Sequence, residues 1–135
     1  MFFSINHQNG VPVYEQVARQ VTFAVADGVL APGDLLPSVR ELARDLAINP
    51  NTVARAYRDL QTQGLVEQAP GIGLAVRRGT VRDCQTTRRR IVEARVAETL
   101  DEAFQSGLEA AAIRKIVDAK LGKLERAAPQ QKVSS

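Results

Sequence analysis

The stretch from residue 37 to residue 65 most constrains what this chain can fold into, because it predicts two short helices joined by a tight turn. Ser38 is a good N-cap for the first helix, and Glu41 three residues later completes the pattern of a capping box. Asn49 caps the second helix, a proline follows at its first position, and Gly64 ends it. Each helix has one apolar side at helical spacing. The apolar residues are Val39, Leu42, Ala43 and Leu46 in the first helix, and Val53, Ala56, Tyr57 and Leu60 in the second.

The opposite side of the second helix is polar and basic. At about 100° per residue, Asn51, Arg55 and Arg58 point away from the apolar side, together with Thr62. Guanidinium, amide and hydroxyl groups can bind phosphates and read base edges in a major groove. The pair of helices is therefore typical of a helix-turn-helix, although a plain helical hairpin with a solvated charged face has the same pattern.

The flanking segments favour a winged helix, which is a mainly α fold with a small β-wing. A first helix is expected to begin near Pro12 and to end at Gly28, and residues 2–6 form a short strand or an extended arm. After the helix pair, two short apolar runs enclose a turn that contains Gly71 and Gly73, which predicts a β-hairpin. These glycines would let the hairpin tip approach DNA closely, or they simply make the turn possible.

Composition limits the possible functions. The chain has 135 residues, enough for one compact domain and a small appendage, and no apolar run approaches the length of a membrane span. Nothing suggests secretion, and the single cysteine favours a reducing, cytoplasmic location. One histidine, no P-loop and no dinucleotide-binding glycine motif argue against an enzyme, a metal site or a bound cofactor.

The basic charge is concentrated after the hairpin. Residues 1–76 contain five arginines and seven acidic residues, whereas residues 77–90 contain six arginines and one acidic residue. This local charge fits a nucleic-acid contact, and it equally fits a flexible, solvated hinge. The neighbouring arginines would lower the pKa of the Cys84 thiol, so a redox role and an incidental cysteine both stay open.

Several short segments of the sequence resemble the GntR family of bacterial transcription regulators, in particular its small YtrA-like branch. The matching segments are PVYEQ at residues 12–16, GVLAPGDLLPSVRELA at 28–43, INPNTVARAYRDL at 48–60 and GIG at 71–73. They occur in order and cover residues 12–76, which makes the resemblance more specific than any single short motif.

The resemblance implies a DNA-binding winged helix that acts on a two-fold symmetric operator. Arg40 matches an arginine that family members use to contact DNA, and Asn51 and Thr52 match positions at the start of the recognition helix that face the groove and the backbone. The alternative is that Arg55 pairs with Asp59, and Arg44 with Glu41, as ordinary helix-surface ion pairs. The wing departs from the family because its tip is uncharged. The predicted DNA-binding residues are Ser38, Arg40, Arg44, Asn51, Thr52, Arg55, Arg58, Gly71 and Gly73.

The remaining residues predict two amphipathic helices between about Asp83 and Arg126, separated at Gly107. Two such helices cannot close a core alone, so they bury their apolar sides against a second copy or, alternatively, against their own winged helix in a monomer. The resemblance implies a helical dimerisation tail without a large effector domain. The predicted dimerisation residues are Val92, Val96, Leu100, Phe104, Ile113, Ile116, Val117 and Leu121.

The predicted organisation is therefore a winged helix at residues 1–78, a dimerisation tail at 79–126 and a disordered end at 127–135. The predicted function is a homodimeric repressor, or less often an activator, that inserts residues 50–63 of each protomer into the major grooves of a palindromic operator on double-stranded DNA. The alternative is a winged helix that binds a protein or an RNA instead. The sequence identifies no effector, although a small ligand would fit between the tail helices or at the dimer interface.

Overall fold

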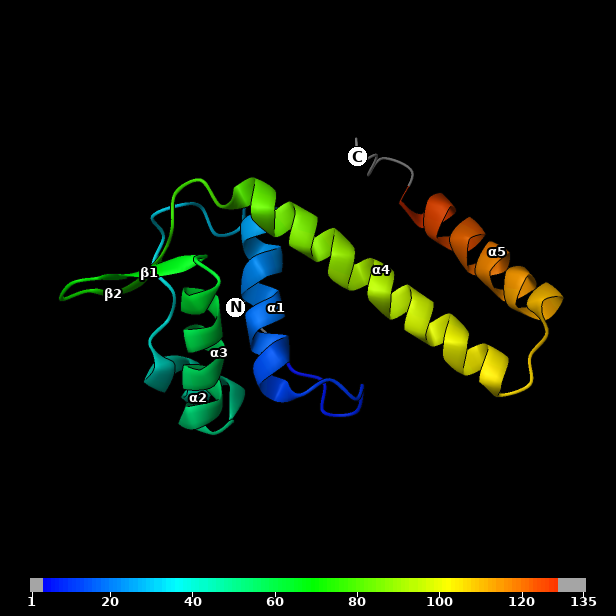
Figure 1. Ribbon diagram of the computed structural model, residues 1–135, viewed down its shortest axis with the longest axis horizontal. Helices are drawn as coiled ribbons and strands as arrows, with labels where there is room; N and C mark the ends of the chain where they lie inside the picture. The colour runs from blue at the N-terminus through cyan, green and yellow to red at the C-terminus, as the bar shows by residue number, and fades with distance from the viewer. Residues whose placement is uncertain (1–3, 129–135) are drawn as a thin grey trace. The chain divides into compact units, whose positions relative to one another are not determined.

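The computed structural model describes residues 4–128, which form five helices and two strands (Figure 1). The chain divides into two compact units, one up to Ile91 and the other from Val92 on. Of the predicted arm at residues 2–6, only residues 4–6 are described, and they have no regular structure. The predicted disordered end falls almost entirely outside the described residues. The elements are α1 (Val13–Ala26), α2 (Val39–Leu46), α3 (Pro50–Thr62), β1 (Val66–Ala69), β2 (Gly73–Val76), α4 (Val81–Gln105) and α5 (Ala110–Ala127).

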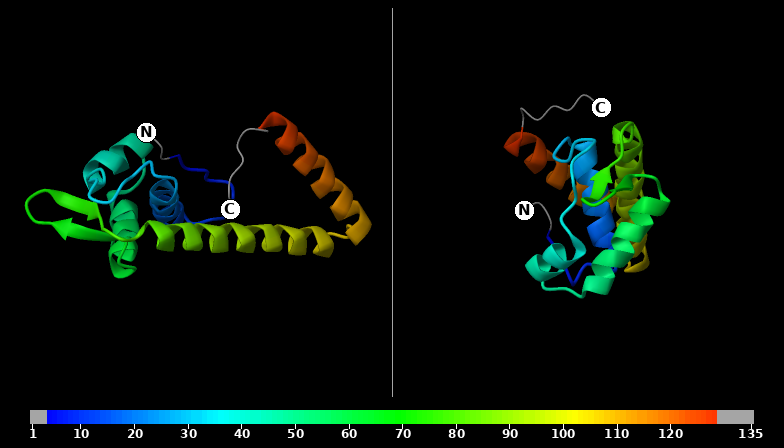
Figure 2. Two further views of the ribbon diagram at one scale, coloured as in Figure 1. Left: turned by 90° about the horizontal axis from the view of Figure 1, so that it is seen from above. Right: turned by 90° about the vertical axis from the view of Figure 1, so that its left-hand side faces the viewer.

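Three helices enclose the core of the first unit. Both α1 and α2 pack against α3, and α1 and α3 lie side by side (Figures 1 and 2). The predicted apolar sides face this core, with Leu46 and Val39 at its margin. This packing leaves the opposite side of α3 open to solvent, as the sequence predicted. The fully buried side chains include Val17, Val21 and Val25 of α1, Leu42 of α2, and Val53, Ala56 and Leu60 of α3.

The predicted helix caps form. The backbone N–H of Glu41 donates to Ser38 Oγ, and the backbone N–H of Ser38 donates to Glu41 Oε1. Both hydrogen bonds are 3.0 Å long. Asn49 Oδ1 accepts from the backbone N–H of Asn51 at 2.8 Å. The turn between α2 and α3 passes through Ala47, whose φ of 55° closes α2 in the left-handed region. These local bonds fix where α3 begins.

The wing is an antiparallel hairpin that projects beyond the helices (Figure 2). Its register runs from Val66 opposite Val76 to Ala69 opposite Gly73. Gly71 has φ of 78° and Gly73 has φ of 142°, conformations that other residues rarely adopt, so the turn itself requires both glycines. The segment before α2 adds an unpredicted partner, because Leu35 bridges to Ala75 of β2.

The first turns of α4 belong to the first unit. The helix begins at Val81, and Cys84 is fully buried in the core. Arg88 forms an ion pair with Asp27, which follows α1. The idea of a flexible hinge over residues 77–90 is therefore wrong from Val81 on, and the compact unit extends past the predicted domain boundary at residue 78.

The second unit contains the rest of α4 and α5, as the two amphipathic segments predicted. No residue of α5 is buried, and the apolar side chains of both helices are mostly exposed in the single chain. Among residues 4–128, no helix is both long and apolar enough to cross a membrane.

Candidate nucleic-acid interface

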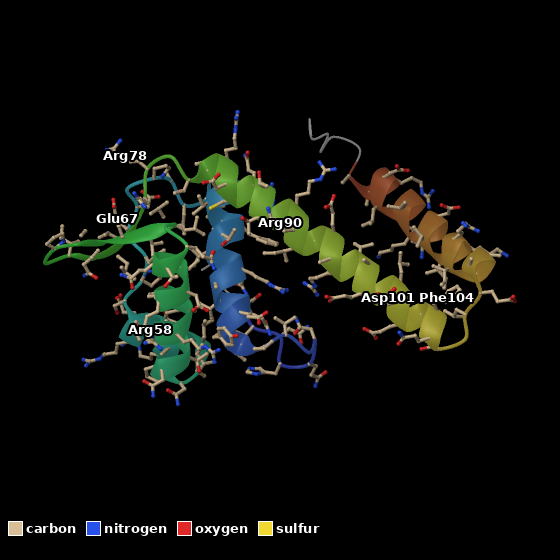
Figure 3. All side chains as sticks on the ribbon, viewed as in Figure 1. Arg58, Glu67, Arg78, Arg90, Asp101 and Phe104 are labelled. Carbon is tan, nitrogen blue, oxygen red and sulfur yellow. The ribbon has the colours of Figure 1, made fainter. Side chains whose placement is uncertain are left out.

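The outward side of α3 is the centre of the candidate interface. Asn51, Arg55, Arg58 and Thr62 are all exposed, opposite the buried stripe. Arg58 makes no ion pair with any residue between 4 and 128, and its place on α3 is labelled in Figure 3. Thr52 is only half-exposed, at the side of this face rather than in its middle. The helix thus presents an amide, a hydroxyl and two guanidinium groups to solvent.

The start of α2 adds further donors. Ser38 and Arg40 are exposed, and within the described part of the chain Arg40 has no ion-pair partner. Ser38 Oγ accepts the cap bond from the Glu41 backbone N–H, and its hydroxyl also bonds the Glu41 carboxylate, so Ser38 is engaged within the cap. Arg44 is exposed and its Nε lies 3.9 Å from Asp45 Oδ1, instead of pairing with Glu41. Arg40 is therefore the less engaged of the two arginines on α2.

Arg55 has a partner that the sequence did not indicate. Its Cζ lies 3.7 Å from the centroid of the Tyr14 ring, which α1 supplies. The ion pair between Arg55 and Asp59, considered from the sequence, does not form. Tyr14 is not among the predicted DNA-binding residues. The only sequence feature that drew attention to Tyr14 was its place in the segment PVYEQ. The spacing of residues along the chain cannot show that Tyr14 contacts Arg55, which is far away in the sequence.

The wing differs from the helices in its charge. Gly71 is exposed and Gly73 half-exposed, and Ile72 between them is 69% exposed. At the base of the hairpin, Arg77 Nε lies 3.7 Å from Glu67 Oε1, whereas Arg78 points away from the hairpin (Figure 3). The tip is uncharged, and Arg78 makes no ion pair with any residue that the structure describes.

Cys84 is unsuited to a redox role. Burial in the core, with a smaller contribution from Asp83, raises the pKa of its thiol. The expectation that nearby arginines lower this pKa is wrong, because the helix carries Cys84 inward while Arg82, Arg89 and Arg90 are exposed. Among the described residues, no cluster of three or more His, Cys, Asp or Glu side chains could hold a metal ion.

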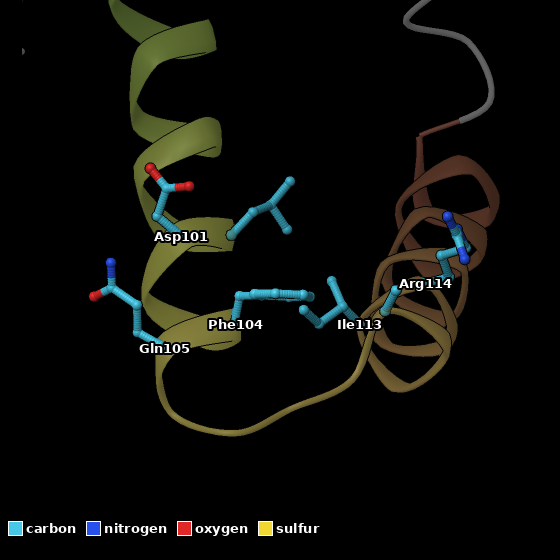
Figure 4. Close-up of a pocket in the computed structure, with 7 residues that line it drawn as sticks. Asp101, Phe104, Gln105, Ile113 and Arg114 are labelled. Atoms are coloured by element: carbon cyan, nitrogen blue, oxygen red, sulfur yellow. The ribbon is translucent and has the colours of Figure 1, made fainter.

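The second unit has a cavity of about 410 Å³ between the end of α4 and the start of α5. Phe104 and Ile113 point toward one another across it, whereas Asp101, Gln105 and Arg114 point away (Figure 4). The facing groups are apolar, which suits another apolar side chain better than a charged ligand. Leu100, Phe104 and Ile113, predicted for dimerisation, thus lie together here.

Comparison with known proteins extends over most of the chain. Residues 13–76 match the family described as "Bacterial regulatory proteins, gntR family". The "HTH-type transcriptional repressor YtrA" of Bacillus subtilis (strain 168) is 31% identical over 105 residues, which are 78% of this chain and 81% of that protein.

Solved structures of transcriptional regulators are also similar to this chain over most of its length. A transcriptional regulator from Oenococcus oeni is 34% identical, with a TM-score of 0.60 over 89% of this chain and 99% of that one. YtrA from Sulfolobus acidocaldarius, described as a GntR-family transcription factor, is 33% identical, with a TM-score of 0.56 over 72% of this chain and 99% of that one. The similarity therefore reaches beyond the helix-turn-helix into the helices that follow.

Proposed function

Because the chain belongs to the GntR family of bacterial transcriptional regulators, we propose that it is a repressor that binds a palindromic DNA operator as a homodimer. The family and the mainly helical fold with a small wing are as the sequence predicted. In this proposal, the protein acts in the cytoplasm, and α3 of each protomer enters one of two successive major grooves of the DNA. The helix α2 and the wing contact the flanking sugar-phosphate backbone.

The observation that supports DNA binding most strongly is the open side of α3. A helix capped by Asn49 exposes Asn51, Arg55 and Arg58, while its opposite side anchors it in the core. Arg40 adds a guanidinium group from the start of α2, where Ser38 is also exposed, and no described acidic side chain neutralises Arg40 or Arg58. Such a rigid, basic helix surface suits both phosphate contact and base readout.

The exposed apolar sides of the tail support the homodimer. Val96 is 55% exposed and Phe104 is 64% exposed, and α5 has no buried residue at all. Burying one such side chain fully would contribute about 1.5–3 kcal/mol, so several together can drive association. A second copy offers the same apolar surface, as a two-fold symmetric interface requires. The half-exposed Ile113 and the exposed Val92, Leu100, Ile116, Val117 and Leu121 complete the proposed interface.

Selection from random double-stranded DNA tests the proposal. We expect enrichment of one palindrome, bound much more tightly than random duplex, with affinity that falls steeply as salt concentration rises. Arg40→Ala and Arg58→Ala should each weaken operator binding by about 1–3 kcal/mol. Arg114→Ala, which removes an exposed arginine from α5, is the matched control and should bind like the parent.

Two results would contradict the proposal. One is an absence of preference among duplexes, and the other is tighter binding to RNA than to any selected duplex. Unchanged operator binding by both arginine variants would show that the α3 and α2 surface is not the interface.

A further inference from the structure

The stack of Arg55 on Tyr14 joins two elements of the candidate interface. Arg55 belongs to α3 and Tyr14 to the first turn of α1, and the two helices pack together. The distance of 3.7 Å from Cζ to the ring centroid is well inside the range of about 6 Å over which a cation is attracted to an aromatic face. An exposed, flexible arginine is thereby held in one place.

The stack leaves the hydrogen-bonding groups of Arg55 available. A guanidinium group is planar, and its N–H donors point outward in its plane, so stacking occupies its face and not its donors. The nearby carboxylate of Glu15 is engaged elsewhere, because its Oε2 lies 3.5 Å from Arg19 and its Oε1 accepts from the Tyr14 hydroxyl at 3.4 Å. No ion pair with Arg55 occurs in the described part of the chain. The donors of Arg55 can therefore take an external anion.

The position of the stack indicates which anion. Tyr14 holds Arg55 at the side of the α3 face that borders α1, whereas Asn51 and Thr62 lie nearer the middle of that face. The middle of a helix in a major groove faces base edges, and its sides face the two phosphate backbones. A planar guanidinium binds a phosphate through two parallel N–H bonds.

We infer that Tyr14 and Arg55 form a phosphate-binding pair for the DNA backbone, in which Arg55 binds the phosphodiester and Tyr14 positions Arg55. This inference rests on the proposed DNA-binding function. It assigns Tyr14 a role beyond the core and gives Arg55 a contact that is independent of base sequence. Arg58, which has no aromatic partner among residues 4–128, provides the internal comparison.

A double-mutant cycle on the full-length protein tests the pair. Binding to the selected operator and to a random duplex of equal length is measured over a range of salt concentrations. Arg55→Ala should weaken both complexes by the same factor, about tenfold, and lower the slope of log affinity against log salt by about 1. Tyr14→Leu should weaken both by about two- to fivefold, and Tyr14→Phe, which keeps the ring, should bind like the parent.

The double variants show whether Tyr14 acts by positioning Arg55 or only by packing in the fold. In the Arg55→Ala background, Tyr14→Leu should have no further effect, whereas in the Arg58→Ala background it should keep its full effect. If Tyr14→Leu weakens DNA binding as much in the Arg55→Ala background as in the parent, Tyr14 does not act by positioning Arg55. A loss confined to the operator would overturn the phosphate assignment, because Arg55 would then read bases. The preference of the parent for its selected operator over random duplex reports on the proposed function separately.

Discussion

Glu41 shows how one side chain fixes the start of an element. It accepts a hydrogen bond from the Ser38 backbone N–H, and its own backbone N–H donates to Ser38 Oγ. The bonds with the Ser38 backbone and side chain lower the pKa of Glu41, with a smaller contribution from Arg44. The ionised carboxylate is therefore the form that the folded cap favours.

This lowered pKa predicts a dependence of stability on pH. A carboxyl whose folded-state pKa lies below its unfolded-state value contributes stability above the unfolded-state pKa, and that contribution is lost as pH falls through the folded-state value. Acidification from about pH 7 to pH 3 should therefore lower the urea midpoint of the parent more than that of Glu41→Gln. Glu98→Gln, which removes an exposed carboxylate from α4, should behave like the parent. Equal acid sensitivity of Glu41→Gln and the parent would exclude the ionised cap.

Cys84 gives a second prediction at this scale. Burial raises the pKa of its thiol, so the native protein presents neither a thiolate nor an accessible sulfur. A thiol reagent at about pH 8 should label Cys84 at least about 100-fold more slowly in the native protein than in denaturant. Rapid labelling of the native protein would show that the start of α4 is not packed in the first unit.

Among single residues, the sequence predicted those whose roles are local. Ser38 and Asn49 were identified as caps because a cap binds backbone groups two or three residues away. The partner of Arg55 could not be identified, because Tyr14 approaches it only through the packing of α1 on α3. The burial of Cys84 was missed for the same reason.

At the scale of elements, α3 depends on its cap for a defined beginning. Asn49→Ala removes the oxygen that accepts from Asn51, and should lower the free energy of unfolding by about 1 kcal/mol. Asn49→Asp keeps an acceptor and should stay within a few tenths of a kcal/mol of the parent. Urea unfolding without DNA measures this, with the exposed Gln61→Ala on the same helix as a control. An Asn49→Ala protein as stable as the parent would show that the cap bond is unimportant.

The wing illustrates what local patterns encode and what they do not. Its two strands and glycine turn were predicted from two short apolar runs on either side of Gly71 and Gly73. The bridge from Leu35 to Ala75, and the bond from the Leu36 N–H to Leu74 O at 2.8 Å, were not predicted. The segment before α2 has no strand pattern of its own, and joins the hairpin only once the helices have placed it there.

At the scale of the whole molecule, the exposed apolar tail predicts the oligomeric state. Phe104→Glu and Leu100→Glu should convert a dimer to a monomer in size-exclusion chromatography with light scattering, because a buried, unpaired carboxylate costs several kcal/mol, about 3 or more. Ala94→Glu places the same charge on the other side of α4 and should stay dimeric. A monomeric parent, or dimeric Phe104→Glu and Leu100→Glu proteins, would contradict the proposed interface.

The central proposal is that two copies of α3 read one symmetric operator, and a hydroxyl-radical footprint on the selected duplex tests it most directly. We expect two equivalent protected half-sites whose centres lie about 10–10.5 base pairs, or a multiple of that spacing, apart. Protection of both half-sites should weaken together in Arg58→Ala at the lowest protein concentration that saturates the parent. A single protected half-site, or protection spread evenly along the duplex, would contradict the account.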